Sequence, residues 1–580
     1  MTSTYSVVAV AIVITATMLI GANGLRLSRT TSDFYVASRT VSPWWNASAI
    51  GGEYLSAASF LGVAGLIFAY GADMLWFAVG YTAGYLVLLT LVAAPLRRSG
   101  AYTLPDFAEE RLASVPVRRI ASLLTVGIGW LYLLPQLQGA GLTLYTVTGL
   151  SPLVGAVAVA VVVVVNVMAG GMRSITIVQA FQFWLKLAAI TIPMVFLLLA
   201  WQHDGAPTPI GPTPPAFTER TTVRVNSAVT VRVHEPVRVT VTGVVDGDRL
   251  RESPVRLSTG THRIDQGTSV TFPAGAVVPQ VTSIPATTGE QWALPLSGTS
   301  GDHSLYVVYS LIVATFLGVM GLPHVIVRFY TNPNGWAARR TTVVLLVLLG
   351  VFYVQLPLYG MFGRLYTPEL LMTGRTDATI LLLPARVIGG LGGDLLSALV
   401  AGGAFAAFLS TASGLTVAVA GVISRNTLRR FGITGFRIAA VGAMTVPLAM
   451  TLVSSRLSVA DVVGLAFAVA ASSLCPLVVL GIWWRGLTSV GAAAGMTVGG
   501  GLALTAGLLT LMGAAQPGWW MDLLRWPAAW TVPIGFAVMV GVSLATPGST
   551  PPGVARLMAR LHAPESLGLR STAAREEAAQ

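Results

Sequence analysis

Charge is scarce in this chain. Asp, Glu, Lys and Arg make up 10% of its 580 residues, whereas hydrophobic residues make up 54%. A soluble globular protein averages about 25% charged residues, so the composition excludes an ordinary soluble domain. Lysine occurs once, at Lys186, and cysteine once, at Cys475, so no disulfide can form within the chain. The sequence also contains no metal-ligand cluster and no nucleophile–base constellation, and we therefore do not expect an enzyme.

Long apolar runs are abundant instead. Thirteen segments are long and apolar enough to span a bilayer, so we expect an all-α polytopic membrane protein in contact with lipid. The segments are Tyr5–Leu25, Trp44–Tyr70, Leu75–Leu96, Ile120–Thr148, Leu153–Ala169, Ile175–Trp201, Leu305–Val327, Thr341–Tyr366, Leu395–Ser424, Phe436–Ser455, Val459–Trp484, Val490–Gly513 and Leu524–Ala545.

The arginines indicate how these spans are oriented. With the N-terminus outside, 21 of the 35 basic residues fall in inner loops and the tail, Arg328 among them, against five in the short outer loops. The positive-inside rule then predicts a multi-pass protein of the plasma (inner) membrane, with the N-terminus outside and a cytoplasmic tail over 547–580. Because the arginines lie in these loops, we attribute the net charge of +12 to membrane orientation and expect no nucleic-acid partner.

One connection differs from the others. Residues 202–303 are mostly polar, and apolar and polar residues alternate over Thr221–Val233 and Pro236–Val245. Alternation of this kind is typical of half-buried strands, and the DGD at Asp246–Asp248 suits a hairpin turn. We therefore predict a small extracellular β-rich insert over 202–303; a partly disordered segment rich in Gly and Pro is the alternative.

Two predicted spans contain residues that weaken a continuous helix. The second contains Gly51-Gly52-Glu53, and the seventh contains Gly318, Gly321 and Pro323. Freed carbonyls are tolerated at bilayer depth only where they line a cavity or bind something. Four spans separate the two segments, which is the spacing of two inverted five-helix repeats. The repeats would be helices 2–6 within residues 1–201 and helices 7–11 within residues 304–546.

The ninth span contains hydroxyl groups where a lipid-facing helix needs none. Over Gly402–Ser424, four hydroxyl residues stand among Gly and Ala: Ser410, Thr411, Ser413 and Thr416. Hydroxyl oxygens are hard ligands that suit a dehydrated cation. The alternative is that the hydroxyls bond to their own helix carbonyls and the small residues only permit close packing.

Five motifs in this order resemble the sodium/solute symporter family, and within it the cation–acetate or monocarboxylate branch. They are DFYVASRTVSPWWNASAIGGEYLSAASFLGVAGLIFAYG at Asp33–Gly71, RRSGAYTLPDFAEERL at Arg97–Leu112, GGMRSITIVQAFQ at Gly170–Gln182, GVMGLPHVIVRFYT at Gly318–Thr331 and AAFLSTASGLTVAVAGVIS at Ala406–Ser424. The resemblance runs over nearly all thirteen spans and leaves out the insert.

The resemblance implies a LeuT-type inverted-repeat bundle, with one extra helix before the core and two after it. It also implies a sodium site whose ligands fall on the carbonyls of Gly52, Leu55 and Ala407 and on the hydroxyls of Ser410 and Thr411. Na⁺ would be the coupling ion, with H⁺ as the alternative, and no organic cofactor is implied. Two positions depart from other members: Thr176 replaces an acidic residue, and Ser59 replaces a sugar-binding Gln of the glucose branch. Both favour a small substrate over a sugar.

Two intramembrane charges are candidates for coupling, because a charge in the hydrocarbon region is costly. Glu53 could sense the cation, carry a proton or pair with Lys186; alternatively, Glu53 caps the broken helix and Lys186 binds a carbonyl. For the substrate, Ser59, Gln136 and Thr315 are candidate side chains, unless they only hold helices together.

These observations predict sodium-coupled symport of a small organic anion, a monocarboxylate such as acetate, propionate or pyruvate, by alternating access. The alternatives are a sodium symporter for another small solute such as proline or pantothenate, a proton-coupled monocarboxylate symporter, and a ligand-sensing receptor whose insert binds the ligand. The oligomeric state is left open.

Overall fold

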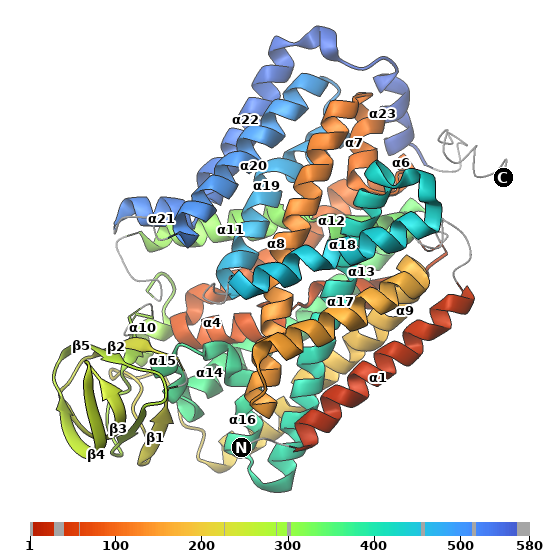
Figure 1. Cartoon of the computed structure of the whole chain (residues 1–580). Coiled ribbons are helices and arrows are strands. Elements are labelled where there is room, and N and C mark those ends of the chain that lie inside the picture. Colours follow the sequence, from red (N-terminus) through yellow and green to blue (C-terminus); the bar gives the residue numbers. More distant parts are fainter. Residues whose placement is uncertain are drawn as a thin grey trace.

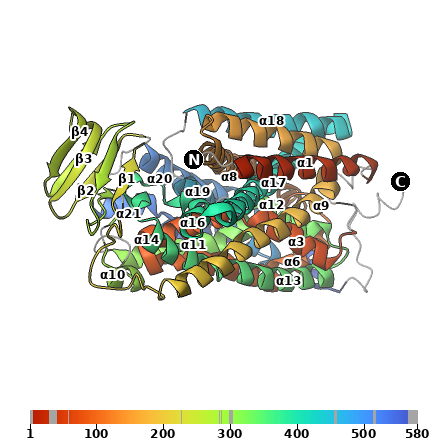
Figure 2. The same cartoon turned by 90° about the horizontal axis from the view of Figure 1, so that it is seen from below.

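The computed structural model describes residues 4–27, 37, 40–56, 58–225, 227–282, 284–285, 287–297, 303–453, 459–512 and 518–564. Most of these residues form a helical bundle with a small sheet at one end (Figure 1, Figure 2). Residues 565–580 of the predicted tail lie outside the described residues.

Among the described residues, ten long helices build most of the bundle. They are α1 (Thr4–Leu27), α8 (Val115–Thr148), α9 (Pro152–His203), α11 (Ser304–Gly321), α13 (Gly335–Tyr353), α17 (Gly390–Thr427), α18 (Gly432–Val453), α19 (Val459–Trp483), α20 (Ser489–Leu511) and α22 (Ala528–Ala545). The shorter helices are α3 (Pro43–Tyr54), α4 (Val63–Tyr70), α5 (Leu75–Val87), α6 (Ala93–Ser99), α7 (Leu104–Leu112), α10 (Gly289–Ala293), α12 (Pro323–Val327), α14 (Leu356–Tyr366), α15 (Glu369–Thr373), α16 (Thr379–Val387), α21 (Trp519–Arg525) and α23 (Val554–His562).

Among the described residues, 11 helical runs are long and apolar enough to cross a membrane. Two of them include residues from two predicted spans. Pro152–His203 contains the fifth and sixth spans, and its backbone leaves helical geometry at Gly171, where φ is 53°. Ala58–Ser99 contains the third span and the second half of the second. The number thirteen therefore stays a prediction, while the polytopic helical character agrees with the structure.

α17 is the central helix of the bundle. Every residue from Ala401 to Val422 is buried, and α17 packs against α1, α3, α8, α9, α16 and α18. Small side chains on all its faces let these neighbours approach closely. The stretch of hydroxyl and small residues noted in the sequence thus lies in the protein interior and not against lipid.

Two helices are interrupted, each within a few residues of the glycines noted in the sequence. The first break follows α3 at Leu55, whose ψ is 78°, and the chain resumes in a π-helical turn, η2 (Ala58–Gly62). Gly51 and Gly52 themselves are helical. The expectation that they interrupt the helix is therefore wrong, because the break lies a few residues later, at Leu55. Gly52 is required for close packing instead, because a Cβ there would overlap the Gln179 carbonyl oxygen. The second break lies at Leu322, between α11 and α12.

In the part of the insert that the structure describes, seven strands form the antiparallel sheet at the end of the bundle. They are β1 (Thr221–Arg224), β2 (Val229–Val233), β3 (Val237–Val245), β4 (Asp248–Leu257), β5 (Gly260–Ile264), β6 (Ser269–Phe272) and β7 (Gln280–Val281), in the order β1-β6-β3-β5-β2-β7, with β4 beside β3. Strands thus occupy the alternating segments. Asp246 and Gly247, both at positive φ, make the β3–β4 hairpin turn expected from the DGD. The extracellular side and the limits of the insert stay predictions.

The sheet is joined to the bundle through α10. The indole Nε1 of Trp292 donates to the carbonyls of Ile67 (2.8 Å) and Phe68 (3.1 Å), close to the end of α4. Side chains of the sheet share an apolar cluster with Phe68 and with Leu371 of α15. At the other end of the bundle α23 packs against α6, where Arg98 donates to the Leu561 carbonyl at 3.3 Å (Figure 1).

Candidate functional site

The first helix break leaves main-chain carbonyls without their usual helical partners. In a continuous helix the amide of Ser56 would donate to the Gly52 carbonyl, but here it donates to Tyr54 O at 2.8 Å. The carbonyls of Gly52 and Leu55 consequently accept hydrogen bonds from side chains of other helices. The break thus produces acceptors inside the bundle, as the sequence predicts.

Helix α17 brings its hydroxyl pair to this break. Ser410 Oγ lies 2.6 Å from Gly52 O and 3.0 Å from Ala407 O, and Thr411 Oγ1 donates to Glu53 O at 2.5 Å. The five residues assigned to the sodium site, Gly52, Leu55, Ala407, Ser410 and Thr411, therefore lie together. We call them the oxygen cluster. That they bind sodium stays a prediction.

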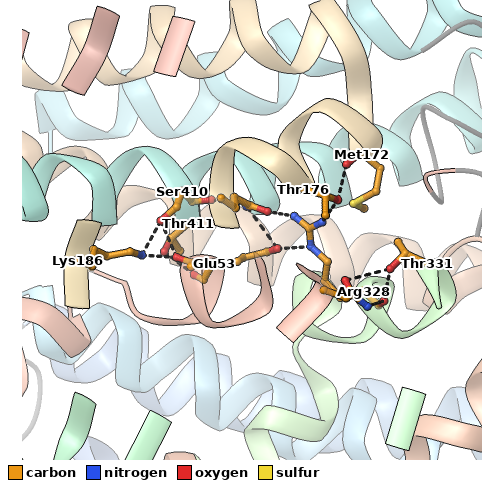
Figure 3. Close-up of polar contacts among 11 residues, drawn as sticks. Glu53, Met172, Thr176, Lys186, Arg328, Thr331, Ser410 and Thr411 are labelled. Atoms are coloured by element: carbon orange, nitrogen blue, oxygen red, sulfur yellow. Dashed lines mark hydrogen bonds and ion pairs between the residues drawn. The ribbon is translucent and has the colours of Figure 1, made fainter. Parts of the chain in front are cut away.

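Lys186 places its ammonium group in the oxygen cluster (Figure 3). It comes from the second half of α9 and is fully buried. Its Nζ donates to the carbonyls of Gly52 and Leu55, the latter at 2.9 Å, and to Ser410 Oγ at 2.7 Å. Of the alternatives left open by the sequence, the structure shows Lys186 bound to carbonyls rather than paired with Glu53.

Glu53 pairs with an arginine instead. Arg328 Nε donates to Glu53 Oε2 at 2.6 Å, and both side chains are buried. The same guanidinium donates to Thr176 Oγ1 at 2.8 Å and to Gln179 Oε1. We call Glu53, Thr176, Gln179 and Arg328 the ion-pair cluster (Figure 3). Gln179 connects it to the oxygen cluster, because its Nε2 donates to Ser410 O at 2.7 Å.

The position of Arg328 corrects the sequence analysis, which counted it among inner-loop arginines. It lies in a short 3₁₀ helix, η5 (Arg328–Thr331), that directly follows α12, and its side chain is 0% exposed. Arg328 and Gln179 are functional candidates that the sequence reasoning missed. The sequence did contain a signal for Arg328: it is a charged residue five positions after Pro323, as Glu53 is a charged residue beside the first break. Residues next to a helix break of this kind lie inside the bundle.

A cavity of about 460 Å³ runs along α11. Its lining includes His303 at the start of α11 and Thr315 near the break, together with Tyr81 of α5 and Phe467 of α19. The rings of Tyr81 and Phe467 are in contact, with centroids 5.0 Å apart. The cavity therefore reaches from the end of the bundle near α21 to an aromatic pair close to both helix breaks.

Beyond this aromatic pair lie four buried hydroxyl groups. Ser59 Oγ is 3.0 Å from the Tyr353 hydroxyl, and Ser56 Oγ is 3.3 Å from the Tyr132 hydroxyl. Tyr353 contacts the ring of Tyr81 (6.2 Å between centroids), and Tyr132 contacts that of Phe467 (5.9 Å). We call Ser56, Ser59, Tyr132 and Tyr353 the hydroxyl cluster.

The three substrate candidates occupy different places in this arrangement. Thr315 lines the cavity and donates to its own helix at Leu311 O (2.8 Å). Ser59 belongs to the hydroxyl cluster. Gln136 is buried on α8, one turn after Tyr132, and donates to the main-chain carbonyl of Tyr132 at 3.4 Å. That these residues bind substrate stays a prediction.

The model of the sodium:solute symporter family matches residues 34–205 and 298–499 of this chain. The chain belongs to the sodium:solute symporter family. The two matched stretches lie on either side of most of the insert and contain both helix breaks, Lys186 and the hydroxyl pair of α17. The chain is therefore a multi-pass membrane transporter, as its fold and buried polar clusters indicate.

Relatives extend over most of this symporter. The monocarboxylic acid transporter of Corynebacterium glutamicum is 28% identical over 564 residues, which cover 92% of this chain and 89% of the relative. An uncharacterised symporter of Bacillus subtilis, YwcA, is 28% identical over 493 residues, which cover 83% of this chain and 82% of the relative.

Solved structures establish the fold. A Na⁺-coupled sialic acid symporter in a substrate-bound, outward-open state superimposes with a TM-score of 0.62 at 13% identity, covering 94% of this chain and 97% of that one. The likeness shows that this symporter has the LeuT-type bundle expected from its sequence.

Proposed function

We propose that this symporter takes up a small monocarboxylate, with acetate, propionate and pyruvate as the first candidates, by alternating access coupled to cation entry. The observation that supports this most is the group of buried polar clusters at the two helix breaks, together with a cavity that extends along α11 as far as Tyr81 and Phe467. Transporters of this fold bind substrate and coupling ion at such breaks. The name of the relative from Corynebacterium glutamicum favours the monocarboxylate.

The size and chemistry of the path favour a small anion. The hydroxyl cluster can donate hydrogen bonds to a carboxylate, and the aromatic pair Tyr81–Phe467 covers it on the cavity side. A carboxylate with a short apolar chain would satisfy both surfaces, whereas a sugar would need many more polar partners. Within this proposal Ser59 and Gln136 act at the hydroxyl cluster, and Thr315 acts in the approach to it.

Two cations are candidates for the coupling ion. The family name and five uncharged oxygens that lie together favour sodium. The ammonium group of Lys186, which already binds three of those oxygens, favours the proton.

The orientation of the chain is part of the proposal. The first turn of α1 lies toward the sheet, whereas α23 lies at the opposite end of the bundle (Figure 1). This agrees with an N-terminus and an insert outside the cell and a cytoplasmic tail. The cavity would then face the outside.

The test is uptake of labelled acetate into proteoliposomes that contain the purified protein. Unlabelled propionate and pyruvate should compete, and proline and pantothenate should not. Ser59→Ala should raise the KM for acetate, while Ser397→Ala, a buried serine of α17 outside the three clusters, should leave it unchanged. Competition by proline or pantothenate alone would replace the monocarboxylate by another small solute. Acetate that binds the insert without crossing the membrane would indicate a receptor.

A further inference from the structure

The oxygen cluster holds an ammonium group where the family resemblance implies a sodium ion. Lys186 Nζ has three N–H groups and makes three hydrogen bonds, to Gly52 O, Leu55 O and Ser410 Oγ. We propose that Lys186 is a built-in cation that replaces Na⁺ in this cluster, so that this symporter binds no Na⁺ there. The inference concerns the coupling site of the proposed function and not its substrate.

The chemistry of the cluster accepts either cation. Carbonyl and hydroxyl oxygens present partial negative charge without a carboxylate, which suits one monovalent cation. The oxygens that bind the ammonium belong to α3, to the break that follows it and to α17, and Lys186 itself belongs to α9. A bound Na⁺ would connect α3 with α17, and the lysine makes that connection with a charge fixed to a third helix.

The ammonium and a sodium ion cannot share the cluster. Nζ lies within 2.9 Å of Leu55 O and 2.7 Å of Ser410 Oγ, which is hydrogen-bonding distance to oxygens that a sodium ion would need. A second positive charge at that distance would be strongly repelled in a dry interior. Sodium could therefore bind only if the lysine left the cluster.

The polar groups next to the oxygen cluster bind mainly to one another and not to Lys186. The Glu53 carboxylate binds Arg328 through Oε2, and Gln179 donates to both Glu53 Oε2 and Ser410 O. Lys186 is 0% exposed, so the hydrogen bonds to the oxygen cluster are what compensate its charge. The ion-pair cluster thus leaves the oxygen cluster as the place where the ammonium is best satisfied.

The first experiment measures equilibrium binding of radioactive Na⁺ to the purified full-length protein. Wild type should show no saturable Na⁺ binding that depends on Thr411, whereas Lys186→Ala should show saturable binding that the added Thr411→Ala removes. Gln182→Ala is the matched control, because Gln182 lies one turn earlier on α9, is buried and donates to Thr17 of α1 instead of the cluster. It should behave as wild type.

Saturable Na⁺ binding by wild type that Thr411→Ala removes would overturn the proposal, and this result needs no lysine variant to fold. A folded Lys186→Ala protein without Na⁺ binding would overturn it as well. Lys186→Met, which keeps the length of the side chain without its charge, separates lost charge from lost packing: it should melt lower than wild type and should not bind Na⁺.

Uptake completes the test. Wild-type uptake of labelled acetate at fixed pH should change by less than about twofold when external Na⁺ is replaced by choline. Lys186→Ala should lose at least about tenfold without Na⁺ and recover with Na⁺. Uptake by wild type that collapses in choline would contradict the proposal. If no variant transports acetate, the substrate proposal fails, and the binding experiment still decides the role of Lys186.

Discussion

The ion pair between Glu53 and Arg328 makes a quantitative prediction. Both side chains are buried, and the guanidinium makes three hydrogen bonds, one of them to the carboxylate at 2.6 Å. Two unit charges about 4 Å apart attract by about 4 kcal/mol at an effective dielectric constant of about 20. Removing one partner leaves the other charge buried without compensation, which costs about 3–5 kcal/mol.

We therefore expect Arg328→Met and Glu53→Gln each to lower the free energy of unfolding by about 3–5 kcal/mol. The double variant leaves no uncompensated charge at this position, so it should cost less than the sum of the two, with a coupling free energy of about 2–3 kcal/mol. Denaturant titration of the purified protein in detergent measures all three values against wild type.

Gln182→Leu is the control for this cycle. It removes a neutral buried hydrogen bond, from Gln182 Nε2 to Thr17 Oγ1 at 3.1 Å, and should cost only about 1 kcal/mol. Its effect should add to that of Arg328→Met. If the effects of Glu53→Gln and Arg328→Met also add to within about 0.5 kcal/mol, the pairing of these two residues is refuted.

Three further predictions concern other parts of the molecule. Gly414→Ala should abolish acetate uptake, because its methyl group would overlap the Glu53 carboxylate. Gly402→Ala on the same helix should keep activity, because its methyl group would lie 3.3 Å from Val13 Cγ2 and 3.8 Å from Ala9 Cβ. Trp292→Ala removes the indole that joins α10 to the end of α4, so it should destabilise the packing of α10 against α4 by about 3–5 kcal/mol. Hydrogen exchange at the end of α4 and in α10 should then be faster, and unchanged exchange would contradict this contact. In the insert, burial lowers the pKa of His262, but hydrogen bonds with Asp246 and Ser258 outweigh it and raise the pKa above 6.5. A histidine whose pKa is higher in the folded state stabilises the fold at pH values below its unfolded pKa, and this stabilisation is lost as the pH rises through its folded pKa. Amide exchange in β5 should therefore accelerate over that pH range, and His262→Gln should remove this pH-dependent increase.

The fold was largely predictable because its signals are local. Apolar runs and the alternation over Thr221–Val233 each depend on residues close together in the sequence, and the structure has helices and strands at those places. The orientation inferred from the arginines stays a prediction. The position of the first break was less predictable. Gly51 and Gly52 allow close packing as well as a break, and only the structure shows that α3 continues through them to Tyr54.

The site was predictable where one motif contained it and not where distant segments meet. Ser410 and Thr411 were conspicuous in an apolar helix, and the resemblance added the carbonyls opposite them. The partner of Glu53 lies 275 residues away in the sequence, and no local pattern identifies it. For the same reason the sequence left open whether Lys186 binds Glu53 or carbonyls, a choice that the ion pair with Arg328 decides.

The most direct test of the central claim is accumulation of labelled acetate inside proteoliposomes against its own gradient. With an imposed cation gradient, sodium or proton in separate experiments at otherwise equal composition, the account predicts that internal acetate exceeds external acetate and returns to equality when an ionophore dissipates the driving gradient. Equilibration without accumulation under either gradient would contradict cation-coupled symport of a monocarboxylate.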